Sequence, residues 1–225
     1  LKNIFPAMEF LTASNRKGLG DKVINFDNGN LDAKDKNIIV IGGGDTAMDC
    51  VRTAVRQQAK SIKCLYRRDK ENMPGSDREV YNAVEEGVEF IWLSSPKKFI
   101  GIKNISHVIA EKMQLSKVDS SGRKRPVVIP NSEFKLKADI VIKALGFDPE
   151  NIPVLFNNKD LAVSDVGTVK INLKSMETNI PGVFAAGDIV RGASLVVWAI
   201  KDGRDAAISI HKYLENKITK KIKAA

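Results

Sequence analysis

Three consecutive glycines at the end of an apolar run constrain this chain more than any other feature of its sequence. Residues 37–41 are nearly all Ile and Val, as in a strand buried on both faces of a parallel sheet. Gly42, Gly43 and Gly44 follow, and an apolar helical pattern begins at Asp45-Thr46-Ala47. The strand, the G-x-G-x-x-A spacing and the helix together predict a dinucleotide-binding unit. A glycine-rich turn without a ligand is the alternative interpretation.

Each position of this segment has a physical role in the prediction. Gly42 lets the chain turn sharply out of the strand, and Gly44 has no Cβ that would keep a pyrophosphate away from the backbone. Ala47 is small enough for close packing of the helix on the strand. The free N–H groups and the positive dipole end of the helix then face the phosphates. We therefore expect Gly42 to Thr46 to bind a pyrophosphate.

The next predicted strand, residues 61–66, ends in an arginine pair that predicts the choice of cofactor. A site for NAD places Asp or Glu about 20 residues beyond the glycines, on the ribose 2′-hydroxyl. This chain has Arg67 and Arg68 there. A guanidinium binds a 2′-phosphate through two parallel charge-assisted hydrogen bonds, whereas a carboxylate would repel it. The pair predicts NADP rather than NAD, an exposed arginine pair on a loop being the alternative.

Turn signals and periodicity predict the remaining elements of the first part of the chain. Ser76 and Glu79 have the spacing of a capping box for the helix that follows. Short alternating stretches around Gly101 and Ser121-Gly122 predict a β meander over 98–137. The other predicted elements are a short helix 6–12 with a polar connection to residue 36, a helix 45–59, a turn 72–76, a helix 77–86, and strands 89–93 and 138–144.

The last third of the chain predicts a second nucleotide-binding feature. A hairpin 163–172 turns at Gly167, and a strand 182–188 leads into a tight Gly187-Asp188 turn. Asp188 can accept hydrogen bonds from a ribityl chain, and a helix beginning near Leu195 can stabilise negative charge on a reduced flavin. A simple turn is the alternative. The helix, residues 194–215, is predicted to point one stripe inward: Leu195, Val196, Ala199, Ile200, Ala206, Ala207 and Ile210.

Composition excludes several classes of protein. The chain has 225 residues, 43% hydrophobic and 28% charged, as in an ordinary soluble globular protein. It has no run of 18 apolar residues, so no membrane span and no membrane partner are expected. The net charge of +9 lacks an accompanying aromatic platform, so we expect a solvated surface with one phosphate pocket and no nucleic-acid partner.

Cysteine and histidine add no site of their own to the prediction. Cys50 and Cys64 do not form a C-x-x-C motif, and we expect both to be buried small apolar side chains of a cytoplasmic protein. His107 and His211 are isolated, so neither a metal site nor a catalytic triad is predicted. The chain begins Leu1-Lys2-Asn3, without Met or a signal-peptide pattern, and we expect it to be a piece of a longer protein.

Three stretches together resemble a known family. They are IGGGDTAMDC, LYRRDKENMPGS followed by EEGVEF, and VFAAGDIVRGASLVVWAIKDGRDAA. They are similar to the small (β) subunit of NADPH-dependent glutamate synthase, a two-dinucleotide-domain flavoprotein reductase, over about residues 1–214. The resemblance implies that hydride passes from NADPH to FAD and that electrons pass through iron–sulfur centres to a large subunit. That glutamate synthase large subunit makes two glutamates from glutamine and 2-oxoglutarate.

The resemblance also implies roles for individual residues. The cofactors carry the reaction, so no catalytic residue is expected. Gly42, Gly43, Gly44, Asp45 and Thr46 match the pyrophosphate loop, Arg67 and Arg68 the 2′-phosphate clamp, Ala144, Leu145 and Gly146 the segment lining the nicotinamide half, Gly187 and Asp188 the FAD ribityl contact, and Leu195, Val196 and Val197 the helix start under the flavin.

The chain departs from the family in lacking the first FAD glycine fingerprint and every cluster cysteine. We therefore expect an α/β protein with a Rossmann-like parallel sheet in an NADPH domain with a β meander, residues 4–144, and the C-terminal half of an FAD domain, residues 145–225. The FAD site is incomplete, the iron–sulfur clusters belong to a missing N-terminal region, and the isolated chain is expected to be inactive. The alternatives are a related ferredoxin- or pyrimidine-linked NADPH:acceptor reductase and a non-catalytic nucleotide-binding module.

Overall fold

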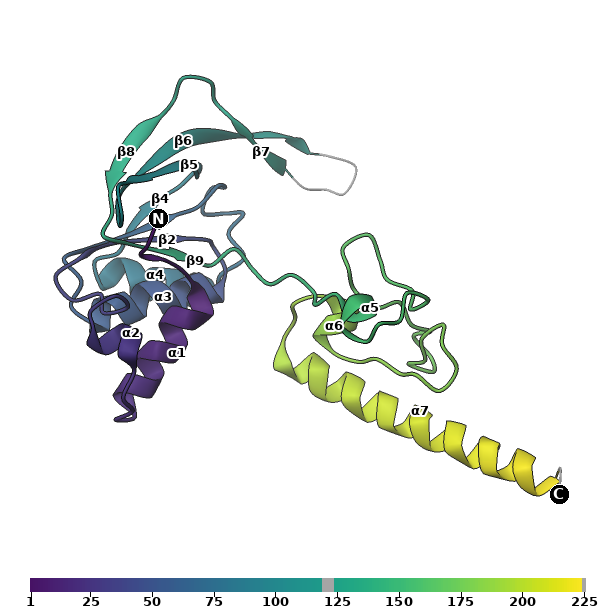
Figure 1. The fold of residues 1–225 in the computed structure, drawn as a ribbon. Helices are drawn as coiled ribbons and strands as arrows, with labels where there is room; N and C mark the ends of the chain where they lie inside the picture. Colours follow the sequence, from purple (N-terminus) through teal and green to yellow (C-terminus); the bar gives the residue numbers. More distant parts are fainter. Residues whose placement is uncertain (119–123, 224–225) are drawn as a thin grey trace. The chain divides into compact units, whose positions relative to one another are not determined.

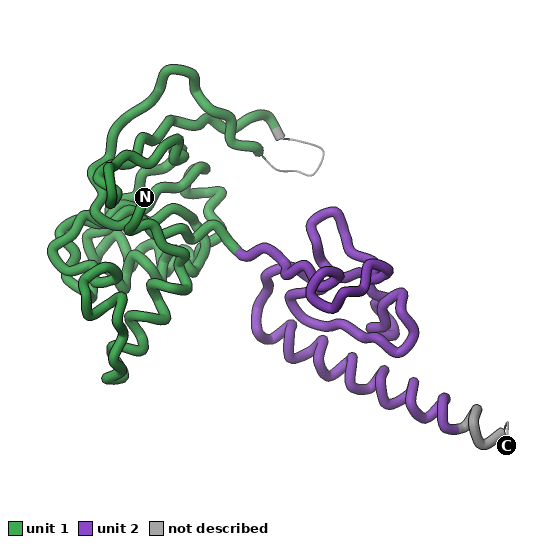
Figure 2. Tube along the Cα trace, in the orientation of Figure 1, with its two compact units in different colours: residues 1–146 green, residues 147–225 purple. Residues whose placement is uncertain are grey.

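The chain divides into two compact units. The computed structural model describes residues 1–118 and 124–223, so the predicted turn at Ser121-Gly122 lies outside the described residues. Unit 1 comprises residues 1–146 and unit 2 residues 147–225 (Figure 2). The sequence placed a domain boundary between residues 144 and 145. Each unit is described below by itself.

A five-stranded parallel sheet forms the centre of unit 1 (Figure 1). Ile38 of the second strand lies opposite Ile62 on one neighbour and opposite Ile140 on the other. The α/β class with a parallel sheet is confirmed. In spatial order the strands are β1 (Ile4–Pro6), β9 (Ile140–Lys143), β2 (Asn37–Ile41), β3 (Ser61–Leu65) and β4 (Glu89–Ile91).

Alternate residues of β2 enter two different cores. Ile38 and Val40 face helices α1 (Ala7–Gly18), α3 (Asp45–Arg56) and α4 (Asp77–Glu85), and belong to a cluster with Phe10 and Val51. Ile39, at 0% exposure, faces the opposite way, into a cluster formed with the antiparallel strands. Both faces of the parallel sheet are therefore covered, as the Ile and Val run predicted.

The antiparallel strands form the second layer, above the parallel sheet in Figure 1. The predicted meander is confirmed in its described part, since β5, β6 and β7 pair antiparallel in chain order. The chain then returns, so that β8 pairs with β6 as well. Val108 and Ala110 of β6 pack toward the parallel sheet. The strands are β5 (Ser94–Gly101), β6 (Ile105–Val118), β7 (Lys124–Val128) and β8 (Phe134–Lys137).

The first predicted helix was too short, and the strand before it was missed. Strand β1 has three residues and pairs with β9, more than 130 residues away, so no local pattern indicated it. Helix α1 continues past residue 12 because Ala13 is buried while its polar last turn faces solvent. The helices of unit 1 are α1 (Ala7–Gly18), α2 (Ile24–Asp27), α3 (Asp45–Arg56) and α4 (Asp77–Glu85).

The predicted capping box at Ser76 is wrong. The Ser76 side chain makes no capping hydrogen bond to α4. Glu79 instead forms an ion pair with Arg52 of α3, and the same guanidinium contacts Glu86 at 2.7 Å. A partner on a neighbouring helix has therefore replaced the local contact.

Unit 2 has little regular structure besides its last helix. Its helices are α5 (Ile152–Leu155), α6 (Asp188–Arg191) and α7 (Val196–Lys223). The turn at Gly167 is confirmed, with the Ser164 N–H donating to the Thr168 carbonyl at 2.8 Å. The predicted strand 182–188 is wrong, because only an isolated bridge joins Phe184 to Glu177.

The predicted inward stripe of α7 is also wrong in most of its members. Within unit 2, α7 packs through Ala199, Asp202, Ala206 and Tyr213, a stripe that contains a charged residue. Hydrophobic periodicity therefore selected a different face. The exposed members of the predicted stripe are Leu195, Val196, Ile200, Ala207 and Ile210. Among the described helices, none combines the length and apolar character that a membrane crossing requires.

Candidate functional site

The glycine loop passes between the ends of two strands. The Gly42 N–H donates to the Leu65 carbonyl at 3.1 Å, and the Ala144 N–H donates to the Ile41 carbonyl at 2.8 Å. Gly42 has φ of +150°, and a Cβ added there would lie 2.1 Å from the Ala144 oxygen. Only glycine fits this close approach. Two of the predicted site segments, the loop and Ala144, are thus in contact.

Gly44 marks the open N-terminus of α3. It is the N-cap residue, and no side chain caps the helix. A Cβ added at Gly44 would meet nothing within 4 Å, so the protein itself does not require glycine at this position. Free N–H groups beside open space are what a phosphate at a helix N-terminus requires. Thr46 lies in the same first turn, half-buried.

The arginine pair follows β3, as the sequence predicted. Arg67 is exposed and Arg68 is half-buried. The Arg68 Nε is buried and has no hydrogen-bond partner among the described residues. A buried unsatisfied donor costs about 1–3 kcal/mol, more when it is charged, so an acceptor supplied by a ligand would remove a real penalty. The residues of unit 1 therefore fit a phosphorylated dinucleotide.

Residues 69–76, which we call the strap, connect the arginine pair to the glycine loop. The Tyr66 hydroxyl donates to the Asn72 carbonyl at 2.9 Å, and Asp69 accepts from the Asn72 N–H and side-chain amide. At its far end the Gly75 N–H donates to the Gly43 carbonyl at 2.9 Å. The strap thus places the predicted 2′-phosphate residues and the pyrophosphate loop in one hydrogen-bonded unit.

The strap also contacts the first turn of α3. The Ser76 N–H donates to the Asp45 Oδ1 at 2.9 Å, so this carboxylate is occupied by a protein donor. A Cβ on Gly75 would lie 3.0 Å from the Gly43 oxygen. The sequence indicated only a turn here. Gly75 was the available signal, since glycine in a loop often marks close backbone approach.

Packing beneath the loop involves Tyr66 and a buried thiol. A Cβ on Gly43 would lie 2.3 Å from the Tyr66 ring, and burial raises the Tyr66 pKa despite Arg68 and Arg67 nearby. The Cys64 thiol lies 3.4 Å from the Gly42 oxygen. Burial raises the pKa of Cys64 and of Cys50 to about 12. Both cysteines are free and buried, which confirms their predicted burial.

The predicted nicotinamide segment differs along its length. Ala144 is buried against the glycine loop, whereas Leu145 is 71% exposed. Gly146 has φ of +99° and no neighbour that an added Cβ would meet within 4 Å. The segment therefore leaves the sheet at Ala144, and its two later residues are held by few contacts.

Unit 2 contains the predicted flavin residues at the two ends of a short connection. Gly187, with φ of +77°, precedes α6, and Asp188 is exposed. Leu195, Val196 and Val197 stand at the start of α7 and are all exposed. Asp188 lines a hollow of about 320 Å³ together with Asp148 and Glu150. These carboxylates can accept hydrogen bonds from hydroxyls, but they do not fit phosphates.

An ion pair between the exposed Arg191 and the buried Asp202, which the sequence did not predict, joins α6 to α7. The Arg191 Nε lies 2.5 Å from Asp202 Oδ2, and the Arg191 Nη2 lies 2.7 Å from Asp202 Oδ1. Arg191 also stacks on Trp198 at 5.1 Å. The hydrogen bond from Arg191 holds the pKa of Asp202 below its usual range. The available signal was the helical spacing of Asp202, three residues after Ala199 and four before Ala206.

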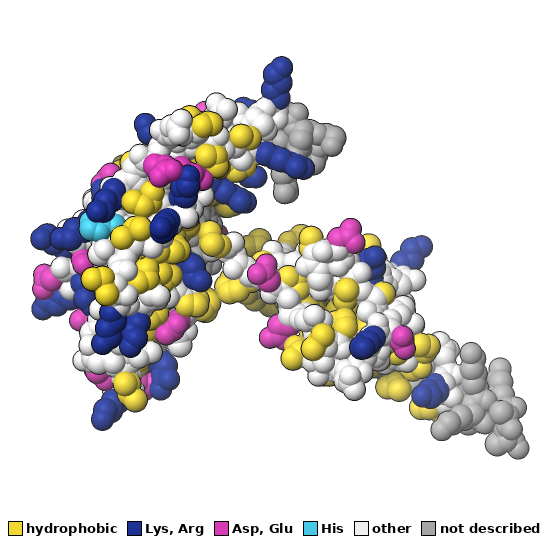
Figure 3. All heavy atoms as spheres, turned by 45° about the horizontal axis from the view of Figure 1, so that its top comes forward, with side chains coloured by type: hydrophobic (Ala, Val, Ile, Leu, Met, Phe, Trp, Pro, Cys, Tyr) yellow, Lys and Arg dark blue, Asp and Glu magenta, His cyan; other side chains and the backbone are white. Residues whose placement is uncertain are grey.

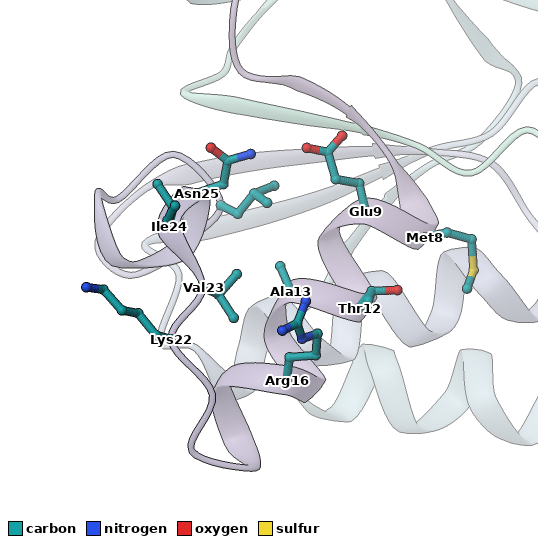
Figure 4. Close-up of a pocket in the computed structure, with 10 residues that line it drawn as sticks. Met8, Glu9, Thr12, Ala13, Arg16, Lys22, Val23, Ile24 and Asn25 are labelled. Carbon is teal, nitrogen blue, oxygen red and sulfur yellow. The ribbon is translucent and has the colours of Figure 1, made fainter.

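A second hollow lies away from all these residues. It has a volume of about 720 Å³ and lies between α1 and the 22–25 segment (Figure 4). Arg16 on its wall is paired with Asp21 at 2.8 Å. No predicted site residue lines this hollow. Neither the hollow nor any other part of the described chain has a group of His, Cys, Asp or Glu suited to a metal.

The chain is similar over nearly its whole length to named proteins. The chain is 56% identical over 217 residues to the glutamate synthase [NADPH] small chain of Azospirillum brasilense, covering 96% of this chain and 45% of that protein. It is also 56% identical over 211 residues to the putative glutamate synthase [NADPH] small chain of Cereibacter sphaeroides, covering 94% and 50%. The chain spans about half the length of these relatives.

Among solved structures, the fold is similar to that of FprA, a Mycobacterium tuberculosis oxidoreductase. The TM-score is 0.72 at 17% identity, with 94% of this chain and 59% of that chain covered. The model of the pyridine nucleotide-disulphide oxidoreductase family matches residues 6–203, which is most of the chain. The chain belongs to the pyridine nucleotide-disulphide oxidoreductase family.

Proposed function

We propose that this chain is part of a glutamate synthase small chain and that unit 1 binds NADPH. The observation that carries the proposal is the pairing of an open helix N-terminus at Gly44 with a buried, unpartnered Arg68 Nε, joined by the strap. The relatives named glutamate synthase [NADPH] small chain, at 56% identity, support the same cofactor.

Within this proposal each part of unit 1 binds a different part of the cofactor. The N–H groups at the start of α3 bind the pyrophosphate, and Gly44 leaves room for it. Arg67 and Arg68 bind the 2′-phosphate. Ala144, Leu145 and Gly146 line the nicotinamide half. When bound, NADPH supplies a hydride and FAD accepts it, and the protein needs no acid–base side chain for that transfer.

Unit 2 contains the residues proposed for the flavin. Asp188 would accept hydrogen bonds from the ribityl hydroxyls, and the start of α7 at Leu195, Val196 and Val197 would contact the flavin ring. The described residues of unit 2 offer no glycine loop at the start of a long helix for the FAD pyrophosphate. In this proposal, iron–sulfur centres held outside this chain would pass the electrons on to the large chain, in the cytoplasm, for glutamate synthesis.

The test is the affinity of the chain for NADPH and NADH, measured by titration calorimetry. One charge-assisted hydrogen bond to a phosphate contributes about 1.5–3 kcal/mol, and 1.4 kcal/mol is about tenfold in affinity. Arg67→Ala should therefore weaken NADPH binding at least about tenfold and leave NADH nearly unchanged. Arg16→Ala, which removes an exposed arginine on α1, is the matched control. Equal losses for both cofactors would contradict the 2′-phosphate assignment.

A further inference from the structure

The segment of unit 1 that contains strands β5 to β8 has a large excess of positive charge. Residues 94–137 contain ten Lys and Arg and three Asp and Glu, a net charge of +7, and residues 217–223 carry four further Lys. Figure 3 shows dark-blue side chains spread over the surface of unit 1, with fewer magenta ones among them. The phosphate site uses none of these residues, so it does not account for the charge.

Strand register sorts these side chains between the two faces of the sheet. Phe99, Val108 and Leu136 lie opposite one another and pack toward the parallel sheet. The neighbouring row, Lys98, Ile109 and Lys135, therefore points to the other face, because successive side chains alternate. The next such row is Ile100, His107 and Lys137. We call these two rows the outer face.

The acidic residues of the sheet do not neutralise the outer face. Glu111 and Glu133 both pair with Lys97, at 3.4 Å and 2.6 Å. Lys98 and Lys135 form no ion pair within the described part of the chain. They are two strand spacings apart, about 10 Å, which is close to the Debye length of about 8 Å at physiological ionic strength. Their potentials therefore add.

The outer face also has an apolar centre. Ile100 and Ile109 are half-buried between the exposed lysines, and the adjoining turn carries a fully exposed Ile102. An apolar centre with a charged rim is the usual anatomy of a protein–protein interface. The aromatic rings of these strands, Phe99 and Phe134, pack inward, so no stacking platform for bases faces out. The combination favours a protein partner over a nucleic acid.

We infer that the outer face of strands β5, β6 and β8 is a docking surface for an acidic protein surface. This inference rests on the proposed function, under which the partner is the large chain of glutamate synthase from the same organism. Steering by opposite charge accelerates encounter and is weakened by salt, whereas the isoleucine centre supplies contact area.

The experiment measures association of the purified chain with that large chain by fluorescence anisotropy at 50 and 200 mM salt. The triple variant Lys98→Glu, Lys135→Glu, Lys137→Glu should weaken association by about tenfold or more, and its binding should depend less on salt. The matched control is Lys159→Glu, Lys170→Glu, Lys174→Glu, three exposed lysines of unit 2, which changes the net charge equally. That control should bind like the unaltered chain.

Two further measurements keep the outcome decisive. Circular dichroism checks that the variants fold. If reversing the charge of the three lysines unfolds the sheet, a triple variant with Gln at the same three positions replaces the Glu variant. Calorimetry with NADPH separates failure of the proposed function from failure of the docking surface. The inference is overturned if the outer-face triple variant associates as tightly as the unaltered chain, or if the control triple variant loses as much affinity. It is also overturned if the unaltered chain binds NADPH but does not associate with the large chain. Tight binding of a 30-nucleotide DNA duplex through the same lysines overturns it too.

Discussion

Unit 1 covers both faces of its parallel sheet, whereas unit 2 leaves most of its large apolar side chains exposed. Both apolar clusters found among the described residues consist of unit 1 residues. In unit 2 the buried apolar residues are Leu161, Val169, Met176 and Ala206. Val196 and Phe156 of the same unit are each 74% exposed. Similar apolar patterns thus lead to a packed core in one unit and to an exposed surface in the other.

The difference shows that the interior of each unit is stabilised by a different kind of interaction. In unit 1, burial of apolar area contributes about 25 cal/mol per Å², and the side chains of two layers supply it. In unit 2, the Arg191–Asp202 pair, the stacked Trp198 and backbone turns such as that at Gly167 connect the segments. The first kind of interaction is cooperative and the second is local.

Cofactor retention is the strongest test of this contrast. We expect the purified chain to bind NADPH through unit 1 but to carry no FAD, because unit 2 offers Asp188 and no described glycine loop for a pyrophosphate. The chain should therefore be colourless and should not oxidise NADPH. An absorbance spectrum from about 350 to 500 nm checks this, since bound oxidised flavin absorbs there. A yellow protein with stoichiometric FAD would show that the site in unit 2 is more complete than its geometry indicates.

A matched pair of truncations tests the contrast in packing. Ile140→Ala in β9 removes a side chain with 0% exposure and should lower the free energy of unfolding by about 2–5 kcal/mol. Val196→Ala in α7 removes a side chain that is 74% exposed and should change it by about 0.5 kcal/mol or less. Urea unfolding followed by circular dichroism measures both. A large loss for Val196→Ala would show that this face of α7 is covered in solution.

The same contrast explains how much of the fold could be predicted. The run from Ile38 to Ile41 specified a strand buried on both faces, and the structure has both covering layers within unit 1. The α7 stripe could not be predicted, because it contains the buried Asp202, which is paired with Arg191. Hydrophobic periodicity does not reveal such a pair. Strand β1 was missed for a related reason, since its pairing with β9 is wholly non-local.

For the candidate site, local motifs predicted the loop but not its support. The sequence predicted that the glycine loop with Gly42 and Gly44 follows one strand and that the arginine pair follows the next. In the structure these two strands, β2 and β3, are parallel neighbours, so their carboxyl ends meet at the same end of the sheet. The strap was visible only as a turn, since its contacts to Gly43 and Asp45 join residues about 30 positions apart. The capping-box prediction failed because Arg52 supplies Glu79 with a charged partner on another helix.

Acid should destabilise both units, and one carboxylate of each unit, Asp139 or Asp202, serves as a probe. Burial acts to raise the pKa of Asp139, but hydrogen bonds from the Asn37 N–H and side-chain amide outweigh it and lower the pKa. The Arg191 hydrogen bond lowers the pKa of Asp202. A carboxylate whose pKa is lowered in the native state stabilises the fold at pH values above its usual pKa of 3.8. That stabilisation is lost as the pH falls through the native pKa.

Two reporters separate these effects, since Trp92 lies in unit 1 and Trp198 in unit 2. Asp139→Asn should lower the free energy of unfolding of unit 1 by about 2 kcal/mol at pH 7. It should also reduce the additional loss of that free energy between pH 5 and pH 3. Trp198→Phe makes Trp92 the sole tryptophan for that measurement by urea unfolding. Asp202→Asn, followed by Trp198 in a Trp92→Phe background, should flatten the acid dependence of unit 2 alone. Loss of both signals together in either variant would contradict separate stabilisation.

The smallest expected effect tests whether the strap positions the glycine loop. Tyr66→Phe keeps the ring under Gly43 but removes the hydrogen bond from its hydroxyl to the Asn72 carbonyl, worth about 1 kcal/mol. If the strap holds the loop in its binding geometry, the NADPH affinity should fall by about fivefold. Tyr81→Phe, at an exposed position of α4, is the control and should bind NADPH normally. An unchanged affinity in Tyr66→Phe, with the hydroxyl's loss seen only in the free energy of unfolding, would mean that the strap braces the fold without positioning the loop.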